Sequence, residues 1–379
     1  MEKLKFGMVG GGNGAFIGNV HRRGATEDNL ARLVAGCFTR NPEKNIATAK
    51  AWDVDDLSRV YSNYKEMADA ESQREDGIDF VTIVTPTDTH YDIAKYFLQR
   101  GINVVCDKPV TVTVEEGEEL KQLAEEKGLL FGVTYTYGSY AAVQQARAMI
   151  DGGELGRILN IVAEYPQDWV IVQTVAESSD QATWRLDPVR AGGTACISDI
   201  GTHVEALISR MTGLKMKKVL ARFTGYAPAS TMDHDVQILM QYEGGVPGMM
   251  WASQIATGAD CAVKIRVYGE KGSVEWCHLN PMEITYAPLN RPVRTITANR
   301  EYNKRECLNL CRLPAGHPEG FYQAFANIYK AYCLHLLSRK EGKDENTLRY
   351  FTIADGIESL KFVRACVESN AHNNVWVEV

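Results

Sequence analysis

The chain has 379 residues, of which 45% are hydrophobic and 23% are charged, and its formal net charge is -7. This is the composition of an ordinary globular protein, and the length predicts about two domains, so disordered and fibrous classes are excluded. The acidic balance argues against nucleic acid as a partner, because a phosphate-binding surface needs clustered Lys and Arg.

The beginning of the chain and its cysteines bear on where the protein works. Residues 6–9 already have the pattern of a strand, which leaves no room for a signal peptide, and no apolar run reaches the roughly 18 residues of a membrane span. The nine cysteines are scattered through predicted strands and helices, as expected of reduced thiols. We therefore expect a cytoplasmic protein without a membrane partner.

The first third of the chain alternates short apolar runs with amphipathic stretches, which is typical of βαβ units around a parallel sheet. Strands are predicted at 4–9, 33–38, 79–84 and 103–106, and helices at 41–52 and 89–100. A last apolar run at 129–135 completes this part. The sequence therefore predicts an amino-terminal α/β domain over residues 1–137.

The pattern changes beyond residue 137. A helix at 141–150 ends at a glycine pair, a strand follows at 158–165, and glycine-punctuated alternating runs from residue 218 predict an antiparallel meander. Two long closing helices are predicted at 319–337 and 348–368. Residues 138–379 are therefore predicted to form a second α/β domain built on a broad, mainly antiparallel sheet.

A glycine-rich turn follows the first strand and reads Gly10-Gly11-Gly12-Asn13-Gly14-Ala15. In that place, backbone amides at a helix amino terminus can hold the pyrophosphate of a dinucleotide. Gly10, Gly12 and Ala15 satisfy the spacing G-x-G-x-x-A, but Gly18 is the packing glycine if residues 13–15 are an insertion. Gly10 and Gly12 keep their roles in both registers, so the turn predicts a dinucleotide site.

The end of the second strand bears on which dinucleotide fits. Residues 38–41 lack the Asp or Glu that would bind the ribose hydroxyls of NAD. Arg40, which follows Thr39, can pair with the 2'-phosphate of NADP, stack on adenine or lie solvated at a helix start. NAD and NADP therefore both stay open at this point.

Asp199 and His203 lie four residues apart in a predicted helix at 196–211 that has an apolar stripe. The spacing places both on one face, where a carboxylate can orient an imidazole that removes a hydroxyl proton. A surface ion pair has the same spacing, and on spacing alone it is the preferred interpretation.

Three further motifs change that interpretation. They are Thr85-Pro86-Thr87-Asp88-Thr89-His90, the run from Gly101 to Asp107-Lys108-Pro109, and Gly192-Gly193 before Asp199-Ile200-Gly201-Thr202-His203. In order and spacing, these motifs together resemble the Gfo/Idh/MocA oxidoreductase family. The resemblance covers the amino-terminal domain closely and the stretch 184–203 well.

The resemblance implies roles for individual residues. Lys108 matches the lysine of the family's Glu-Lys-Pro motif, in which Asp107 replaces the glutamate, and Asp199 and His203 match its aspartate and catalytic histidine. The implied cofactor residues, which lie in the turns at the strand ends, are Gly10, Gly12, Asn13, Ala15, Phe16, Ile17, Thr39, Arg40, Thr85, Pro86, His90, Asp107 and Lys108. The implied fold is a Rossmann domain followed by an α/β domain whose open-faced sheet commonly serves in homo-oligomerisation.

Residues 15–18 and His21-Arg22 look like a subgroup that includes inositol dehydrogenases and glucoside 3-dehydrogenases. The expected function is hydride transfer to NAD(P) from a secondary ring hydroxyl of a sugar, a glucoside (such as its C3 hydroxyl) or an inositol, and the subgroup favours NAD. In the implied mechanism His203 takes the hydroxyl proton, Asp199 orients it, and Lys108 hydrogen-bonds the reacting oxygen or relays the proton.

Other residues are weaker candidates for contacts with such a ring. Besides Lys108, Asp199 and His203, the expected substrate contacts are Asp168, Arg185 and His317, because forked donors and polar side chains near aromatics suit a polyol. Tyr137 is a lesser candidate, since it can equally end a strand. Cys307, Cys311 and His317 lack the paired spacing of zinc modules, so we expect no metal.

Two other functional classes fit part of the pattern. A redox-assisted lyase or glycosidase would reduce its bound NAD only transiently before an elimination. A non-catalytic dinucleotide sensor would use the same glycine turn, but it would have no need of a base such as His203.

Overall fold

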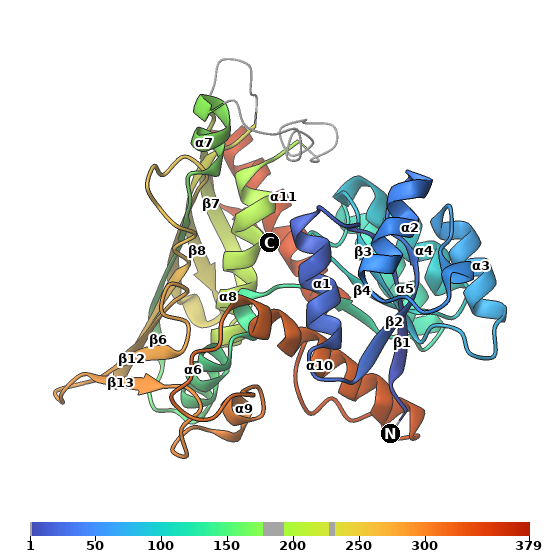
Figure 1. Cartoon of the computed structure of the whole chain (residues 1–379). Coiled ribbons are helices and arrows are strands. Elements are labelled where there is room, and N and C mark those ends of the chain that lie inside the picture. Colours follow the sequence, from blue (N-terminus) through green and yellow to red (C-terminus); the bar gives the residue numbers. More distant parts are fainter. Residues whose placement is uncertain (1, 177–192, 227–231) are drawn as a thin grey trace. The chain divides into compact units, whose positions relative to one another are not determined.

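The computed structural model describes residues 2–176, 193–226 and 232–379 (Figure 1). The chain folds into two compact units, of which the first contains Met1–Thr134 and Phe321–Ile357 and the second contains Tyr135–Gly320 and Glu358–Val379. The sequence predicts a single division after residue 137. The late segment returns to the first unit because its long helix packs against the helix that follows the glycine turn.

The first unit is built on a six-stranded sheet with the order β14-β5-β4-β3-β1-β2. Its strands are β1 (Leu4–Gly10), β2 (Ala31–Cys37), β3 (Phe80–Val84), β4 (Asn103–Cys106), β5 (Phe131–Val133) and β14 (Phe351–Thr352). Strands β1 to β5 run parallel, and β14 adds to the edge of β5 in the antiparallel sense. All five residues of β3 are buried, which explains its continuous apolar run.

Helices connect these strands. They are α1 (Phe16–Thr26), α2 (Pro42–Ala51), α3 (Tyr64–Gln73), α4 (His90–Gln99), α5 (Val114–Glu126) and α10 (Phe321–Lys340), with short 3₁₀ turns η1 (Leu57–Arg59) and η2 (Thr87–Thr89). Helix α1 packs on α10, and α4 packs on both α3 and α5. This parallel sheet with its crossover helices confirms the predicted Rossmann architecture.

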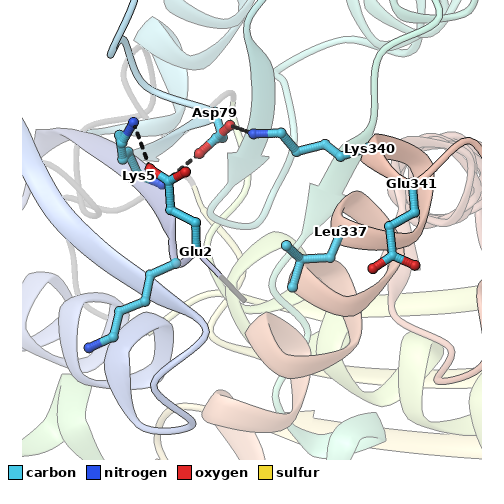
Figure 2. Close-up of a pocket in the computed structure, with 7 residues that line it drawn as sticks. Glu2, Lys5, Asp79, Leu337, Lys340 and Glu341 are labelled. Atoms are coloured by element: carbon cyan, nitrogen blue, oxygen red, sulfur yellow. Dashed lines mark hydrogen bonds and ion pairs between the residues drawn. The ribbon is translucent and has the colours of Figure 1, made fainter.

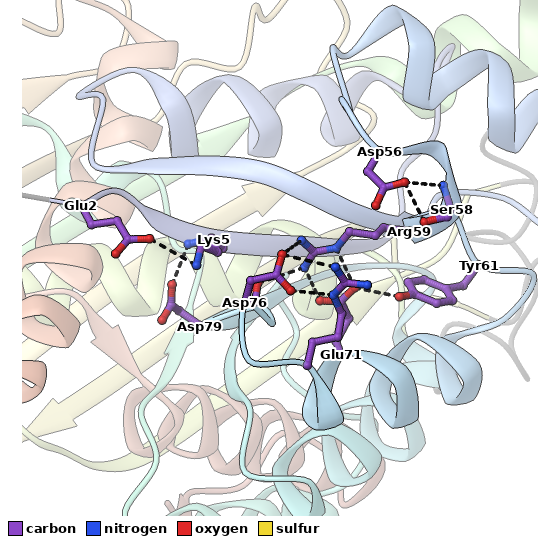
Figure 3. Close-up of polar contacts among 10 residues, drawn as sticks. Glu2, Lys5, Asp56, Ser58, Arg59, Tyr61, Glu71, Asp76 and Asp79 are labelled. Atoms are coloured by element: carbon purple, nitrogen blue, oxygen red, sulfur yellow. Dashed lines mark hydrogen bonds and ion pairs between the residues drawn. The ribbon is translucent and has the colours of Figure 1, made fainter.

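A buried ion pair anchors the segment between β2 and β3 (Figure 3). The guanidinium of Arg59 donates to the carboxylate of Glu71 on α3, and both side chains are almost fully buried. The same carboxylate accepts from the hydroxyl of Tyr61 at 2.8 Å, and burial and this contact raise the pKa of Tyr61. Because these bonds satisfy the buried charges, they hold the segment in which Val60 pairs with Gly36 of β2.

The second unit is built on a nine-stranded sheet with the order β13-β12-β11-β10-β6-β9-β8-β7-β15. Its strands are β6 (Ile158–Pro166), β7 (Met216–Thr224), β8 (Asp235–Tyr242), β9 (Pro247–Ser253), β10 (Lys264–Gly269), β11 (Gly272–Cys277), β12 (Glu283–Pro288), β13 (Arg294–Thr297) and β15 (Val377–Glu378). Its helices and turns are η3 (Tyr137–Ser139), α6 (Ala141–Asp151), α7 (Trp169–Ala176), the π-helical η5 (Ile197–Gly201), α8 (Thr202–Thr212), η6 (Glu243–Gly245) and α9 (Arg305–Leu308). Helix α11 (Ile353–Ala371) contributes to both units.

This second sheet is mainly antiparallel, as predicted, with one parallel pair between β6 and β9. Helices α6 and α8 pack together, and both contact strands of the sheet. Along the central strands buried and exposed residues alternate, so that Ile238 is 1% exposed while its neighbour Leu239 is 46% exposed. The sheet therefore covers a core on one face and leaves apolar side chains on the other.

The helix predicted at 196–211 differs from the structure in its first turns. Residues Ile197–Gly201 form a π-helix, and the regular helix α8 begins only at Thr202. The apolar stripe of the sequence does not show this change. Such wide turns occur often at functional sites, and this one carries Asp199.

Candidate functional site

The glycine turn of the first unit has the backbone that its sequence requires. Gly10 and Gly11 have φ values of 82° and 67°, and a Cβ atom on Gly10 would lie 2.4 Å from the carbonyl oxygen of Val84. A Cβ atom on Gly18 would lie 1.7 Å from the carbonyl oxygen of Gly11. Gly18 is therefore the glycine that lets α1 pack on the turn, and Ala15 is the residue that precedes the helix.

The end of α1 that faces the turn is open to an anion. Ala15 has no side chain that can cap the helix, and the first turn begins with Phe16 and Ile17, whose side chains offer no acceptor. Phe16 is 70% exposed. Backbone N–H groups at such a helix start, next to a glycine turn, suit a pyrophosphate.

Hydrogen bonds tie the turn to the end of β2. The amide of Gly12 donates to the carbonyl of Phe38 at 3.2 Å, and the amide of Asn13 donates to the hydroxyl of Thr48 on α2 at 3.0 Å. Asn45 accepts from the amide of Phe38 at 2.8 Å. These contacts bring Thr39 and the exposed Arg40, which follow Phe38, to the turn. Sequence reasoning missed Asn45 and Thr48, although they are polar positions three apart on one helix face.

A second pair of loops lies at the carboxyl ends of β3 and β4. Thr85 and Pro86 follow β3, and Lys108 follows β4. His90 at the start of α4 is 1% exposed, and its Nδ1 and Nε2 lie 2.8 Å from the carbonyl oxygens of Pro109 and Thr85 respectively. The structure thus joins the two loops through one imidazole, whose nitrogens face the backbone.

Asp107 lies behind Lys108 and is held by the first unit. Its Oδ1 accepts from the amide of Lys108 at 2.8 Å and from the hydroxyl of Thr134 at 3.0 Å, and its Oδ2 lies 3.7 Å from Nε2 of His21. Burial acts to raise the pKa of Asp107, but His21 and Lys108 outweigh it and leave that pKa well below its usual range. Asp107 is therefore an anion that positions the backbone of Lys108, whose own side chain is partly exposed.

In the second unit, His203 lies on α8 within a group of aromatic rings. The centroid of its imidazole lies 5.0 Å from the ring of Tyr137, 5.9 Å from that of Tyr135 and 6.4 Å from that of Tyr165. The hydroxyls of Tyr137 and Tyr165 are 2.6 Å apart. Burial raises the pKa of both phenols, so both remain protonated, and one of them donates to the other. His203 itself is partly exposed.

Asp199 lies on the π turn before α8. Its Oδ2 accepts from the side-chain amide of Gln254 at 3.0 Å, and this contact fixes the carboxylate. The start of the helix is held by Asp233, whose two carboxylate oxygens accept from the amides of Ala195 at 2.7 Å and Ile197 at 2.6 Å. The sequence gives no direct sign of Gln254 or Asp233, since both are distant along the chain.

The remaining predicted residues have different surroundings. Asp168 accepts from the amide of Gly258 at 2.9 Å, and His317 bonds the carbonyl of Pro314 in its own exposed loop at 3.0 Å. Arg185 lies outside the described residues. Cys307 lies on α9 and Cys311 follows that helix as its neighbour, and the described residues contain no group of three or more His, Cys, Asp or Glu side chains placed to hold a metal.

Sequence reasoning also missed His278, which follows β11. Its ring lies 5.1 Å from that of Tyr137, and its Nδ1 donates to the carbonyl of Cys261 at 3.0 Å. Burial lowers the pKa of His278, so the ring is neutral and its other nitrogen is an acceptor. A lone histidine between a strand and a turn carries no motif that could have identified it.

A pocket of the first unit lies at the amino ends of β1 and β3 (Figure 2). Its volume is about 230 Å³, and its lining consists of Glu2, Lys3, Lys5, Asp79, Leu337, Lys340 and Glu341. Lys5 and Asp79 stand at the amino ends of β1 and β3, whereas ligands of doubly wound sheets bind at the carboxyl ends. Two of its cations are paired with acids, Lys5 with Glu2 and Lys340 with Asp79.

Comparison with known proteins gives a consistent result. The protein-family model "Oxidoreductase family, NAD-binding Rossmann fold" matches residues 4–135, and the family model "GFO/IDH/MocA C-terminal domain" matches residues 143–275. An uncharacterized oxidoreductase of Bacillus subtilis is 36% identical over 100% of this chain and 97% of its own. Levoglucosan dehydrogenase of Pseudarthrobacter phenanthrenivorans is 25% identical over 72% of this chain and 73% of its own.

Solved structures are similar over the whole chain. An inositol dehydrogenase homologue from Azotobacter vinelandii, complexed with NAD⁺, has a TM-score of 0.95 at 32% identity, with coverage of 100% of this chain and 98% of that one. A structure of an inositol dehydrogenase homologue from the same organism, complexed with NADH and myo-inositol, has a TM-score of 0.91 at 32% identity and the same coverage. Among the described residues, no helix is both long and apolar enough to cross a membrane.

Proposed function

Since the chain belongs to the GFO/IDH/MocA oxidoreductase family, with an NAD-binding Rossmann fold, we propose that it oxidises a secondary ring hydroxyl of a cyclitol or a pyranose. The resemblance read from the motifs is confirmed at the level of the family, and so is the assignment as an NAD-dependent sugar or polyol dehydrogenase class. Inositols and glucosides, including oxidation at C3, are the proposed substrates within that class.

The observation that carries the proposal is the setting of His203. It is partly exposed beside phenols that burial keeps protonated, so among these rings the imidazole is the group suited to accept a proton near neutral pH. In the pair of Tyr137 and Tyr165 one hydroxyl hydrogen joins the two oxygens, and the other is suited to donate to a ring hydroxyl. A polyol ring offers many such hydroxyls, which agrees with the myo-inositol bound to a similar structure.

The other site residues are assigned supporting roles. Asp199, fixed by Gln254, stabilises the protonated form of His203, and Lys108 donates to the oxygen that becomes a carbonyl. NAD, when bound at the glycine turn, accepts the hydride. NADP remains a proposed alternative through Arg40. Asp168, Arg185 and His317 are proposed as outer contacts of the ring.

Two further properties are part of the proposal. The open face of the nine-stranded sheet is proposed to join copies of the chain into a homo-oligomer, because it exposes Leu239 and Met249. The protein is proposed to work in the cytoplasm, which agrees with nine cysteines that are all free thiols.

The test is a panel of inositols, glucosides and free sugars, followed by the absorbance of NADH and by product analysis. We expect stoichiometric NADH and a keto product for at least one ring substrate. His203→Ala should lower turnover by about two to four orders of magnitude while NADH binding stays near wild type. Lys108→Met should lower turnover as well, and the exposed His372→Ala is the matched control.

Each other outcome has a distinct meaning. Product formation without net NADH would support the redox-assisted lyase or glycosidase. NADH binding without turnover of any ring would favour a dinucleotide sensor. Near-wild-type turnover of His203→Ala on the true substrate would refute His203 as the base.

A further inference from the structure

His90 is a buried histidine whose two ring nitrogens face the same kind of atom. Its Nδ1 and Nε2 each lie 2.8 Å from a backbone carbonyl oxygen, that of Pro109 and that of Thr85. A carbonyl oxygen only accepts, so each nitrogen must carry a hydrogen to make its bond. A neutral imidazole has one hydrogen and would set a nitrogen lone pair against a carbonyl at hydrogen-bond distance.

We propose that His90 is an imidazolium that clamps the loop after β3 to the loop after β4 and so positions both for NADH. The proposal rests on the proposed function, because these loops lie at the carboxyl ends of adjacent parallel strands, where dinucleotides bind in such sheets. His90 is then a positioning residue. It holds the carbonyl of Thr85 on one side and, on the other, the carbonyl of the residue after Lys108.

Several titratable groups lie around His90. Asp107, after β4, is an anion that interacts with the ring electrostatically. The other titratable groups near it are Lys108 in the same loop, His21 of α1 beyond Asp107, Asp92 in the first turn of α4, and Glu116 and Glu119 on α5. Glu116 caps its own helix and Glu119 pairs with Lys95, which leaves Asp107 as the acid whose effect on the ring the structure records.

Because His90 is buried, the hydrogen on each ring nitrogen is needed to satisfy the carbonyl that the nitrogen faces. The side chain is 1% exposed, so water does not replace a lost bond to either carbonyl. When the proton leaves, one carbonyl faces a lone pair and the two loops separate. The affinity for NADH should therefore be higher while both ring nitrogens carry hydrogens than after one of these hydrogens is lost.

The first experiment needs no cofactor and no substrate. In protein labelled with ¹⁵N-histidine, both ring nitrogens of His90 should resonate as protonated nitrogens at neutral pH, whereas a neutral ring gives one signal of a lone-pair nitrogen. The signals are assigned by their loss in His90→Gln. A lone-pair signal for His90 at neutral pH overturns the proposal, and this result is independent of whether the enzyme oxidises a sugar.

The second experiment follows NADH fluorescence on binding over neutral to alkaline pH. Wild type should lose about tenfold or more in affinity on the alkaline side, since a bond from a charged donor is lost. In His90→Gln, whose single amide nitrogen cannot replace two ring nitrogens that face different carbonyls, affinity should be low and independent of pH in this range. His372→Gln is the matched control and should follow wild type. A flat profile in wild type overturns the clamp even if His90→Gln fails to fold.

Discussion

Asp107 shows how one shorter side chain changes its surroundings. The family motif has a glutamate there, and the aspartate of this chain reaches Thr134 and the amide of Lys108 but stops 3.7 Å from His21. His21 is fully buried, and its other nitrogen lies 2.7 Å from the hydroxyl of Tyr329 on α10. The late helix thus takes part in a polar network that reaches the loop of Lys108.

Arg40 bears on whether the protein binds NADP or NAD. It is exposed at the end of β2, and no acid stands beside it in residues 38–41 to bind ribose hydroxyls. If Arg40 pairs with a 2'-phosphate, Arg40→Ala should weaken NADP binding about tenfold or more and NAD binding far less, because the charged bidentate contact exists only for NADP.

Titration of each cofactor into wild type and variant checks this. Arg32→Ala, on an exposed position of β2, is the matched control. Equal losses for NAD and NADP would favour stacking on adenine, and no loss for either would leave Arg40 solvated.

The start of the helical segment that carries Asp199 and His203 is held by hydrogen bonds to Asp233, which is distant along the chain. Asp233, 4% exposed, accepts hydrogen bonds from the backbone amides of Ala195 and Ile197, at the start of the π turn. Asp233→Asn replaces one acceptor by a donor that faces an N–H group. It should lower stability by about 1–3 kcal/mol and reduce kcat, because the base and its carboxylate move, while NADH affinity is retained.

Thermal unfolding, kcat and NADH titration separate these effects. Asp151→Asn, the same chemical change at an exposed helix end, should leave all three near wild type. An Asp233→Asn protein with full kcat would show that the hydrogen bonds of Asp233 contribute to stability alone.

The sequence predicts elements well where a local pattern exists and poorly where contacts are distant. The glycine turn, β1 to β4 and α8 follow from periodicity and turn residues. The register of the turn does not, because the choice between Ala15 and Gly18 depends on the 1.7 Å approach to Gly11 that only packing shows. The contacts of His203 with Tyr135 and Tyr165, and those of Asp199 with Gln254, likewise join residues that no spacing relates.

At the scale of the whole molecule, the sequence likewise does not predict which distant segments belong to the same structural unit. The pattern of residues 319–337 predicts a helix but not its partner, and the structure assigns the observed helix, Phe321–Lys340, to the first unit. Each unit therefore contains residues that are far apart in sequence. Truncation near residue 320 would consequently remove part of the dinucleotide-binding unit rather than a terminal extension.

The open face of the nine-stranded sheet leads to a prediction about assembly. Leu239 of β8 lies opposite Met249 of β9 and Leu220 of β7, and Met249 lies opposite Val162 of β6. These residues form one apolar row across four strands, with Leu239 and Met249 46% and 48% exposed. Burial of such side chains between two copies contributes roughly 1.5–3 kcal/mol each, which is enough to favour association.

Leu239→Glu combined with Met249→Glu should therefore dissociate the oligomer, because two carboxylates per chain would be forced into an apolar contact. We expect the association constant to fall by at least about a hundredfold, measured as molar mass by light scattering during gel filtration across a range of concentrations. Leu289→Glu changes a more exposed leucine (63%) beyond the end of β12 and should keep the wild-type mass. A wild-type chain that is monomeric at every concentration would reject the sheet face as an interface between copies, and an oligomer unaffected by the double substitution would move that interface to another surface.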